Sequence, residues 1–221
     1  PSDGRFRFIL YDTDLTLENF SDINIAGLIN SNSEYTLLFR KLLENQIFKN
    51  NFLSRFADIL NTNFIPDRTV SIINNFKSIY DPEIIEHGNR WNTPNLSEWN
   101  GGVQSMVDFY NYRPQAEREQ LIQYFGLEDQ RTIQINVSSS SEGYIKINTI
   151  NILPSTPGVP EQPYPWMGIY FKTIPVKIVA IPKKGFKFKH WLLNDNIFST
   201  SASITVTLDN NKSFTAIFEE Y

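Results

Sequence analysis

The sequence contains no cysteine, which excludes disulfide bonds, thiolate nucleophiles and cysteine-ligated metals. It contains only two histidines, His87 and His190, so we do not expect a histidine-rich metal site or a Ser-His-Asp triad. There is no glycine-rich phosphate loop either, because Gly101 and Gly102 lack both the preceding strand and the required spacing. The common sites built on these residues are therefore excluded or poorly supported.

Strong charge and long apolar runs are also missing. The net charge of the 221 residues is −4, and the basic residues are scattered apart from a group at 183–189, so we expect no nucleic-acid partner. No apolar run approaches the roughly 20 residues that cross a bilayer, and no signal peptide precedes the first strand-like segment. The chain starts at Pro1 within a hydrophobic pattern, and we expect it to be part of a longer or processed protein.

Two kinds of hydrophobic periodicity divide the sequence. Apolar residues recur at helical spacing up to about Leu127 and alternate with polar residues after Gln130. The pattern predicts an α+β protein of two domains, with a mainly helical domain at 1–129 and an antiparallel, β-sandwich-like module at 130–221. We expect the two to fold separately across a modest interface.

Local signals predict where the elements begin and end. The expected helix signals are a cap at Asn45, starts at Pro66, Asp81-Pro82, Gly101-Gly102 and Pro114, and a C-terminal cap at Gly126. The expected strands carry the alternating residues Ile133 to Val137, Val176 to Ala180, Phe186 and Phe188, Ile204 to Leu208, and Phe214 to Phe218. The proline-rich stretch Pro154 to Pro165 is expected to be an exposed loop.

The helical part resembles the CotH kinase family, named after a spore-coat protein. The matching segments, in order, are Arg5 to Asp14, Leu42 to Asn45 with Phe48, Arg55 to Asp58, Leu60 to Thr62, Pro82 to Ile84, His87, Arg90-Trp91, Trp99, Phe109 and Arg113-Pro114. The resemblance implies a divergent protein kinase fold, secreted or displayed on a bacterial surface, that transfers phosphate from ATP to a protein substrate. It also implies that the nucleotide-binding lobe, its lysine and the catalytic-loop aspartate lie upstream of Pro1, so the chain alone is expected to be inactive.

Asp12 and Asp14 match the D-x-D pair of that family. The resemblance implies that Asp12 binds the magnesium ions that bridge the nucleotide phosphates, with Asp14 as a second ligand. Taken alone, two aspartates at the end of a strand are more often turn caps. We expect both carboxylates to lie together beside an open face, and we expect no Mg or ATP to be held by this chain alone.

The β module resembles the divergent internalin-type B-repeat of bacterial surface proteins. The matching residues are Gly143, Tyr144, Gly168 to Phe171, Val176 to Ala180, Pro182, Gly185 to Phe188, Trp191 and Thr215 to Phe218. Such modules are implied to be stalks or adhesive units. An alternative function is therefore a non-catalytic adhesion or carbohydrate-binding protein, with an exposed Trp166 stacking on sugar; the competing interpretation is that Trp166 fills the end of the sandwich.

Other polar residues have simpler interpretations. His87 is expected to pack and hydrogen-bond at a helix end, and Ser138 to Ser141 to form a turn. Glu83 and Glu86 are expected to lie on a solvated helix face rather than to act as a glycosidase pair.

Overall fold

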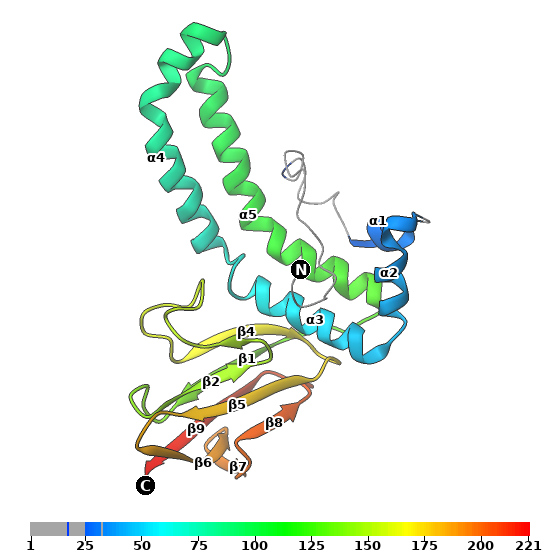
Figure 1. Ribbon diagram of the computed structural model, residues 1–221, viewed down its shortest axis with the longest axis vertical. Helices are drawn as coiled ribbons and strands as arrows, with labels where there is room; N and C mark the ends of the chain where they lie inside the picture. Colours follow the sequence, from blue (N-terminus) through cyan, green and yellow to red (C-terminus); the bar gives the residue numbers. More distant parts are fainter. Residues whose placement is uncertain (1–16, 18–24, 32) are drawn as a thin grey trace, which may run out of the picture.

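The computed structural model describes residues 17, 25–31 and 33–221, and these residues form helices followed by strands (Figure 1). The helices are α1 (Ile25–Asn30), α2 (Glu34–Leu43), α3 (Gln46–Leu60), α4 (Pro66–Trp91) and α5 (Leu96–Phe125). The strands are β1 (Gln130–Val137), β2 (Gly143–Ile147), β3 (Ile150–Asn151), β4 (Trp166–Phe171), β5 (Val176–Pro182), β6 (Phe186–Leu193), β7 (Asn196–Ser199), β8 (Ser203–Val206) and β9 (Lys212–Glu220). The predicted α+β fold class is confirmed.

Three of the predicted helix boundaries are confirmed. The Asn45 side chain accepts a hydrogen bond from the Phe48 N–H, which satisfies one of the free donors at the start of α3. Pro66 is the first residue of α4, where its missing N–H costs nothing. Gly126 follows α5 in the left-handed conformation, with a φ of 61°.

Three others are wrong, because α4 and α5 run through the expected breaks. Pro82 lies inside α4 and Pro114 inside α5. Gly101 and Gly102 are also interior, because α5 begins further upstream, where Asn95 and Glu98 form a capping box. A proline inside a helix costs about 3 kcal/mol and a glycine about 1 kcal/mol, so packing of the two long helices must offset these losses.

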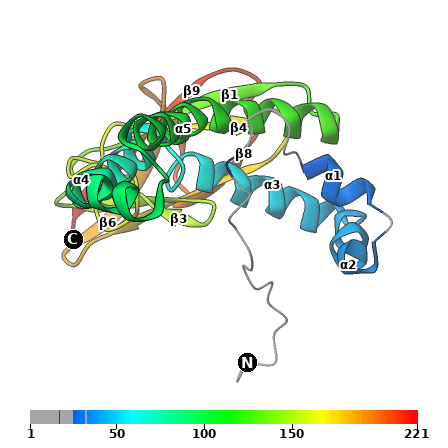
Figure 2. The same cartoon turned by 90° about the horizontal axis from the view of Figure 1, so that it is seen from above.

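Helices α4 and α5 form a long hairpin that projects away from the sheets (Figures 1 and 2). Asp81 on α4 joins the two helices. It accepts hydrogen bonds from Lys77 Nζ at 2.6 and 2.8 Å, and one from the Trp99 indole of α5 at 2.7 Å. The chain turns between the helices through Asn92, which ends α4 in the left-handed conformation.

The strands form two packed sheets. The order is β4-β1-β9-β6-β7 in the five-stranded sheet and β3-β2-β5-β8 in the four-stranded sheet. Most neighbours are antiparallel, as expected, but β1 and β9 are parallel, with Ile133 opposite Lys212 and Val137 opposite Ala216. The alternation of apolar residues did not reveal this, because it is the same in parallel and antiparallel strands that cover one core.

The buried core continues from the sandwich into the helices. Leu53 and Ala57 of α3 and Leu121 of α5 belong to the same apolar cluster as the inward-facing residues of β1, β4 and β9. Helix α3 packs on β4 and lies between the lower part of α5 and the sheets (Figure 1). The helical and β parts therefore share a hydrophobic core. In the described part of the chain, no helix is both long and apolar enough to cross a membrane.

Candidate functional site

The predicted metal ligands Asp12 and Asp14 lie outside the described residues. Among the residues that the structure does describe, no group of three or more His, Cys, Asp or Glu side chains is placed to hold a metal ion. The assignment of Asp12 and Asp14 therefore stays a prediction.

Trp166, the residue considered for sugar stacking, is the first residue of β4 and is only 5% exposed. Its ring belongs to the sandwich core and has no free face on which a sugar ring could stack. Tyr170 and Trp191 are likewise buried. Of the two interpretations of Trp166, the structure agrees with the one in which it fills the sandwich, because β4 turns this ring inward.

The most developed polar site among the described residues surrounds Asp58, on the face of α3 that meets the β module. Asp58 is fully buried, yet no lysine or arginine among the described residues is bound to its carboxylate. It accepts hydrogen bonds from Thr149 N–H at 2.9 Å, Thr149 Oγ1 at 2.6 Å, Tyr170 Oη at 2.8 Å and Asn148 Nδ2 at 3.2 Å. All these donors belong to the β module, so Asp58 ties α3 to the turn after β2 and to β4.

Asn61 forms a second link one turn further along the chain. Its Nδ2 donates to the Ile169 carbonyl at 2.8 Å, and its Oδ1 accepts from the Ile169 N–H at 3.0 Å. Arg118 of α5 donates to the same Oδ1 at 3.0 Å and to the Pro114 carbonyl at 3.1 Å. Asn61 thereby connects α3, α5 and β4.

Burial shifts the pKa values of this cluster. Desolvation raises the pKa of Asp58, although the hydrogen bonds from Thr149, Tyr170 and Asn148 oppose the rise. Burial lowers the pKa of Arg118 to about 10, which leaves the guanidinium charged at neutral pH. Burial and the nearby Asp58 carboxylate raise the pKa of Tyr170, so its hydroxyl stays protonated and donates a hydrogen bond to Asp58.

The cluster is suited to joining parts of the fold rather than to catalysis. Asp58, Asn61, Tyr170 and Arg118 are buried, whereas Asn148 is half-buried and Thr149 exposed. The Asp58 carboxylate accepts four hydrogen bonds from the β module, and the Asn61 oxygen accepts two, so these acceptors are already used within the fold. Sequence reasoning quoted Asp58, Asn61 and Tyr170 only within family motifs. A charged residue beside Ala57 and Leu60 on an apolar helix face was the signal for a buried polar contact.

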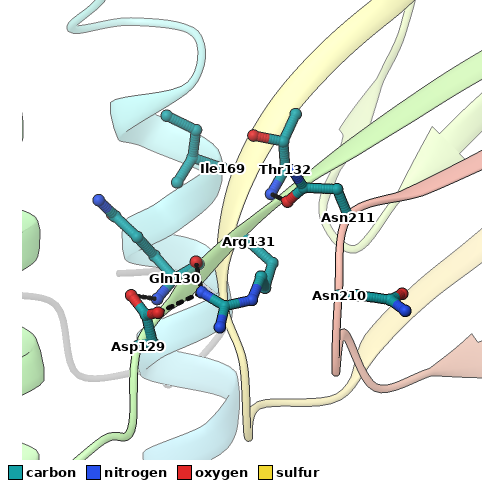
Figure 3. A pocket seen from close by; sticks show the side chains of 7 residues that line it. All are labelled: Asp129, Gln130, Arg131, Thr132, Ile169, Asn210 and Asn211. Atoms are coloured by element: carbon teal, nitrogen blue, oxygen red, sulfur yellow. Dashed lines mark hydrogen bonds and ion pairs between the residues drawn. The ribbon is translucent and has the colours of Figure 1, made fainter.

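A shallow, open depression of about 520 Å³ lies beside this junction (Figure 3). Figure 3 shows the residues that line it: Asp129, Gln130, Arg131, Thr132, Ile169, Asn210 and Asn211. Arg131 is bound to the Asp129 carboxylate and to the Gln130 carbonyl, and Asn211 accepts from the Thr132 N–H at 2.9 Å. The charged groups of the depression thus neutralise each other, and it has no aromatic wall.

Comparison with known families identifies both parts of the chain. Residues 1–116 match the family described as CotH kinase protein, which is more than half of the 221 residues. The chain belongs to the CotH kinase protein family. Residues 172–221 match the divergent InlB B-repeat domain, in the expected order. No curated protein and no solved structure matches the chain.

The junction connects the CotH region to a segment outside both matches. Asp58 and Asn61 lie within residues 1–116, whereas Asn148, Thr149 and Tyr170 lie between that region and the B-repeat at 172–221. Strands β1 to β4 therefore link the CotH region to the B-repeat and complete its sandwich.

Other residues of the CotH motifs lie on the hairpin. The Arg90 guanidinium lies 5.1 Å from the centre of the Trp91 ring near the end of α4. Glu83 and Glu86 are exposed, as expected for a solvated helix face. His87 is also exposed, so the expectation that it packs at a helix end is wrong. The serines before β2 form a turn, as expected.

Proposed function

We propose that the protein containing this chain is a secreted or cell-surface kinase that transfers phosphate from ATP to a protein substrate. Membership of the CotH kinase family over residues 1–116 carries this proposal. In it, residues 1–129 form the C-terminal part of the kinase, and residues 130–221 are an appended surface module. The similarity of residues 172–221 to the divergent InlB B-repeat supports the surface location.

The proposed magnesium ligands are Asp12 and Asp14. Their carboxylate oxygens have the hard-donor chemistry that magnesium prefers, so the residue types fit the ion. When bound, Mg-ATP supplies the phosphoryl group and the cation that neutralises its charge. Two carboxylates provide only a few of the ion's six oxygens, so we expect the pair to bind magnesium weakly unless nucleotide phosphates are also present.

The β module is proposed to be a firmly attached part of the protein rather than a flexible stalk. The shared apolar core and the bonds of Asp58 and Asn61 across the junction support this. An adhesive role without catalysis is the alternative that the B-repeat match favours. The burial of Trp166 removes the exposed ring on which sugar stacking depended.

A kinase assay on the protein with its upstream sequence tests the proposal. We expect phosphate transfer from labelled ATP in the presence of magnesium, and we expect Asp12→Ala to abolish it. Asp209→Ala, a change at an exposed aspartate before β9, is the matched control and should retain activity.

A stability measurement on the 221-residue chain distinguishes a metal ligand from a turn cap. Asp12→Ala should leave its thermal unfolding nearly unchanged, because relief of repulsion from Asp14 offsets part of any loss. A strongly destabilised chain with full kinase activity in the longer protein would identify Asp12 as a structural cap and refute the metal assignment. Absence of ATP-dependent transfer by the longer protein would favour the adhesive alternative.

A further inference from the structure

An apolar stripe runs along the outside of the projecting hairpin. Ile72, Phe76, Ile79 and Tyr80 of α4 are 39%, 53%, 57% and 52% exposed. Their spacing of four, three and one residues places them on one face of the helix. Phe76 and Tyr80 stack with their ring centres 6.4 Å apart. We call these four residues the α4 stripe.

The α4 stripe is separate from the face that packs on α5. Half-buried Val70 and Ile73 and buried Ile84 mark the packed face, which lies roughly 100° further around the helix. The stripe is therefore not an extension of the hairpin's own interior. The hairpin projects from the sheets, so it carries the stripe away from the β module (Figure 1).

Opposite charges lie at the two ends of the stripe. Arg68 lies one turn before Ile72 on the same face, and the exposed Glu83 and Glu86 follow Tyr80. Along the helix axis Arg68 is ~12 Å before Phe76, while Glu83 and Glu86 are ~10 and ~15 Å after it. Arg68 is half-buried and also donates to the Asn63 carbonyl at 2.9 Å, and the exposed Arg90 lies on the same face ~21 Å after Phe76. Along this face the order is therefore positive Arg68, the apolar stripe, negative Glu83 and Glu86, and then Arg90.

We propose that the α4 stripe binds a second copy of this chain, with the two α4 helices antiparallel and Phe76 near the two-fold axis. This arrangement places Arg68 of each copy between Glu83 and Glu86 of the other, so the ion pairs form twice. It also places Ile72 of each copy beside Ile79 of the other. A two-fold interface must be complementary to itself, and this distribution of charge and apolar surface meets that condition.

The size of the stripe sets the strength of the dimer. Four side chains along ~12 Å of helix form a small contact, below the standard protein interface. The dimer is consequently weak and depends on concentration. Its affinity rests on the apolar centre, and its orientation on the charges at the ends.

Sedimentation equilibrium of the 221-residue chain at increasing concentration tests the apolar centre. We expect the mass to rise from one copy to two at concentrations below about 1 mM, the weak end of the affinity scale. Phe76→Ser should weaken the dimer about tenfold or more, since it removes the central ring. Ile85→Ser, at a 62%-exposed residue on another face of α4, is the matched control and should leave the dimer unchanged.

Charge reversal tests the antiparallel arrangement. Arg68→Glu alone, or Glu83→Arg with Glu86→Arg, should weaken the dimer about tenfold through like-charge contacts at both ends. Combining all three changes should restore it to within about threefold, which is ~0.7 kcal/mol. Circular dichroism verifies the fold of each variant. A wild-type chain that stays monomeric, a dimer that survives Phe76→Ser, or a failure of the combined variant to recover would each overturn the proposal.

Discussion

Asn61 forms hydrogen bonds to both backbone groups of Ile169 through its side-chain amide. Ile169 lies in β4, which is an edge strand of the five-stranded sheet and, in the described part of the chain, has β1 as its only strand neighbour. An edge strand leaves alternate N–H and C=O groups unpaired. The side chain of Asn61, the residue that caps the end of α3, therefore takes the place of a neighbouring strand at Ile169.

Hydrogen exchange at Ile169 should distinguish the two bonds of Asn61. Asn61→Ala removes both, so we expect the Ile169 amide proton to exchange faster. Asn61→Asp retains an acceptor for that proton but cannot donate to the Ile169 carbonyl. Its exchange should therefore remain closer to that of the wild type. Equal acceleration in the two variants would mean that loss of packing, rather than the hydrogen bond, exposes the amide.

Replacement of Asp58 should destabilise the helical and β parts together. Asp58→Ala leaves the buried hydroxyl of Tyr170 and the partly buried donors of Thr149 and Asn148 without their acceptor, and we expect a loss of about 3 kcal/mol. Urea unfolding followed by helical circular dichroism and by tryptophan fluorescence should give coincident transitions. Asp209→Ala should cost less than about 0.5 kcal/mol. Separate transitions in the wild type would instead support the prediction of independently folding domains.

The effect of Asp58→Asn should depend on pH. Because the folded pKa of Asp58 is raised above 3.8, its titration favours the folded state at low pH, and this advantage is lost as the pH rises through the folded pKa. The difference in unfolding free energy between wild type and Asp58→Asn should therefore be largest below pH 3.8, fall above it and then become constant. Other carboxylates titrate alike in both proteins and cancel. A difference that grows with pH would contradict the raised pKa.

We expect Gly158 not to tolerate a side chain, because the side chain would clash with α3. Gly185, which has a similar φ but no close neighbour, serves as the matched control. The φ of Gly158 is +79°, and a Cβ there would lie 2.1 Å from the Thr62 carbonyl oxygen at the end of α3. Gly185 has a φ of +92° but open space around it. Alanine at either residue costs about 1 kcal/mol in backbone strain, and Gly158→Ala should cost a further 1–3 kcal/mol through the clash. Thermal unfolding of both variants measures the difference, and equal losses would show that the loop moves freely away from α3.

The hairpin should loosen when Asp81 loses its charge. Asp81→Asn keeps an acceptor for the Trp99 indole but weakens the contact with Lys77, and Asp81→Ala removes both. The ion pair is partly exposed and screened by solvent, so we expect Asp81→Asn to lower the stability only slightly and Asp81→Ala to lower it more. Chemical unfolding should show that order. The reverse order would mean that the indole bond contributes nothing.

The local sequence correctly predicted those helix ends that are fixed by one capping side chain or by one backbone conformation. The cap at Asn45, the start at Pro66 and the end at Gly126 each depend on a contact within one turn. The interior positions of Pro82 and Pro114 depend instead on the pairing of α4 with α5. That pairing is a tertiary contact, and the sequence around each proline gives no sign of it.

The junction was less predictable than the elements that form it. The alternating strands and the inward orientation of their apolar residues follow from periodicity. The four bonds of Asp58, however, join residues about 90 to 112 positions apart in the chain. The assignment of Asp12 and Asp14 rests on family resemblance and remains a prediction.

The parallel pairing of β1 with β9 has a consequence for synthesis of the protein. β1 is the first strand after α5, whereas β9, which lies between β1 and β6, comes after the other four strands of this sheet along the chain. During translation the five-stranded sheet thus remains in two pieces, β4-β1 and β6-β7, until β9 leaves the ribosome. A nascent chain stopped before Lys212 would expose the inner edges of both pieces. The five-stranded sheet can therefore form only when β9 is present.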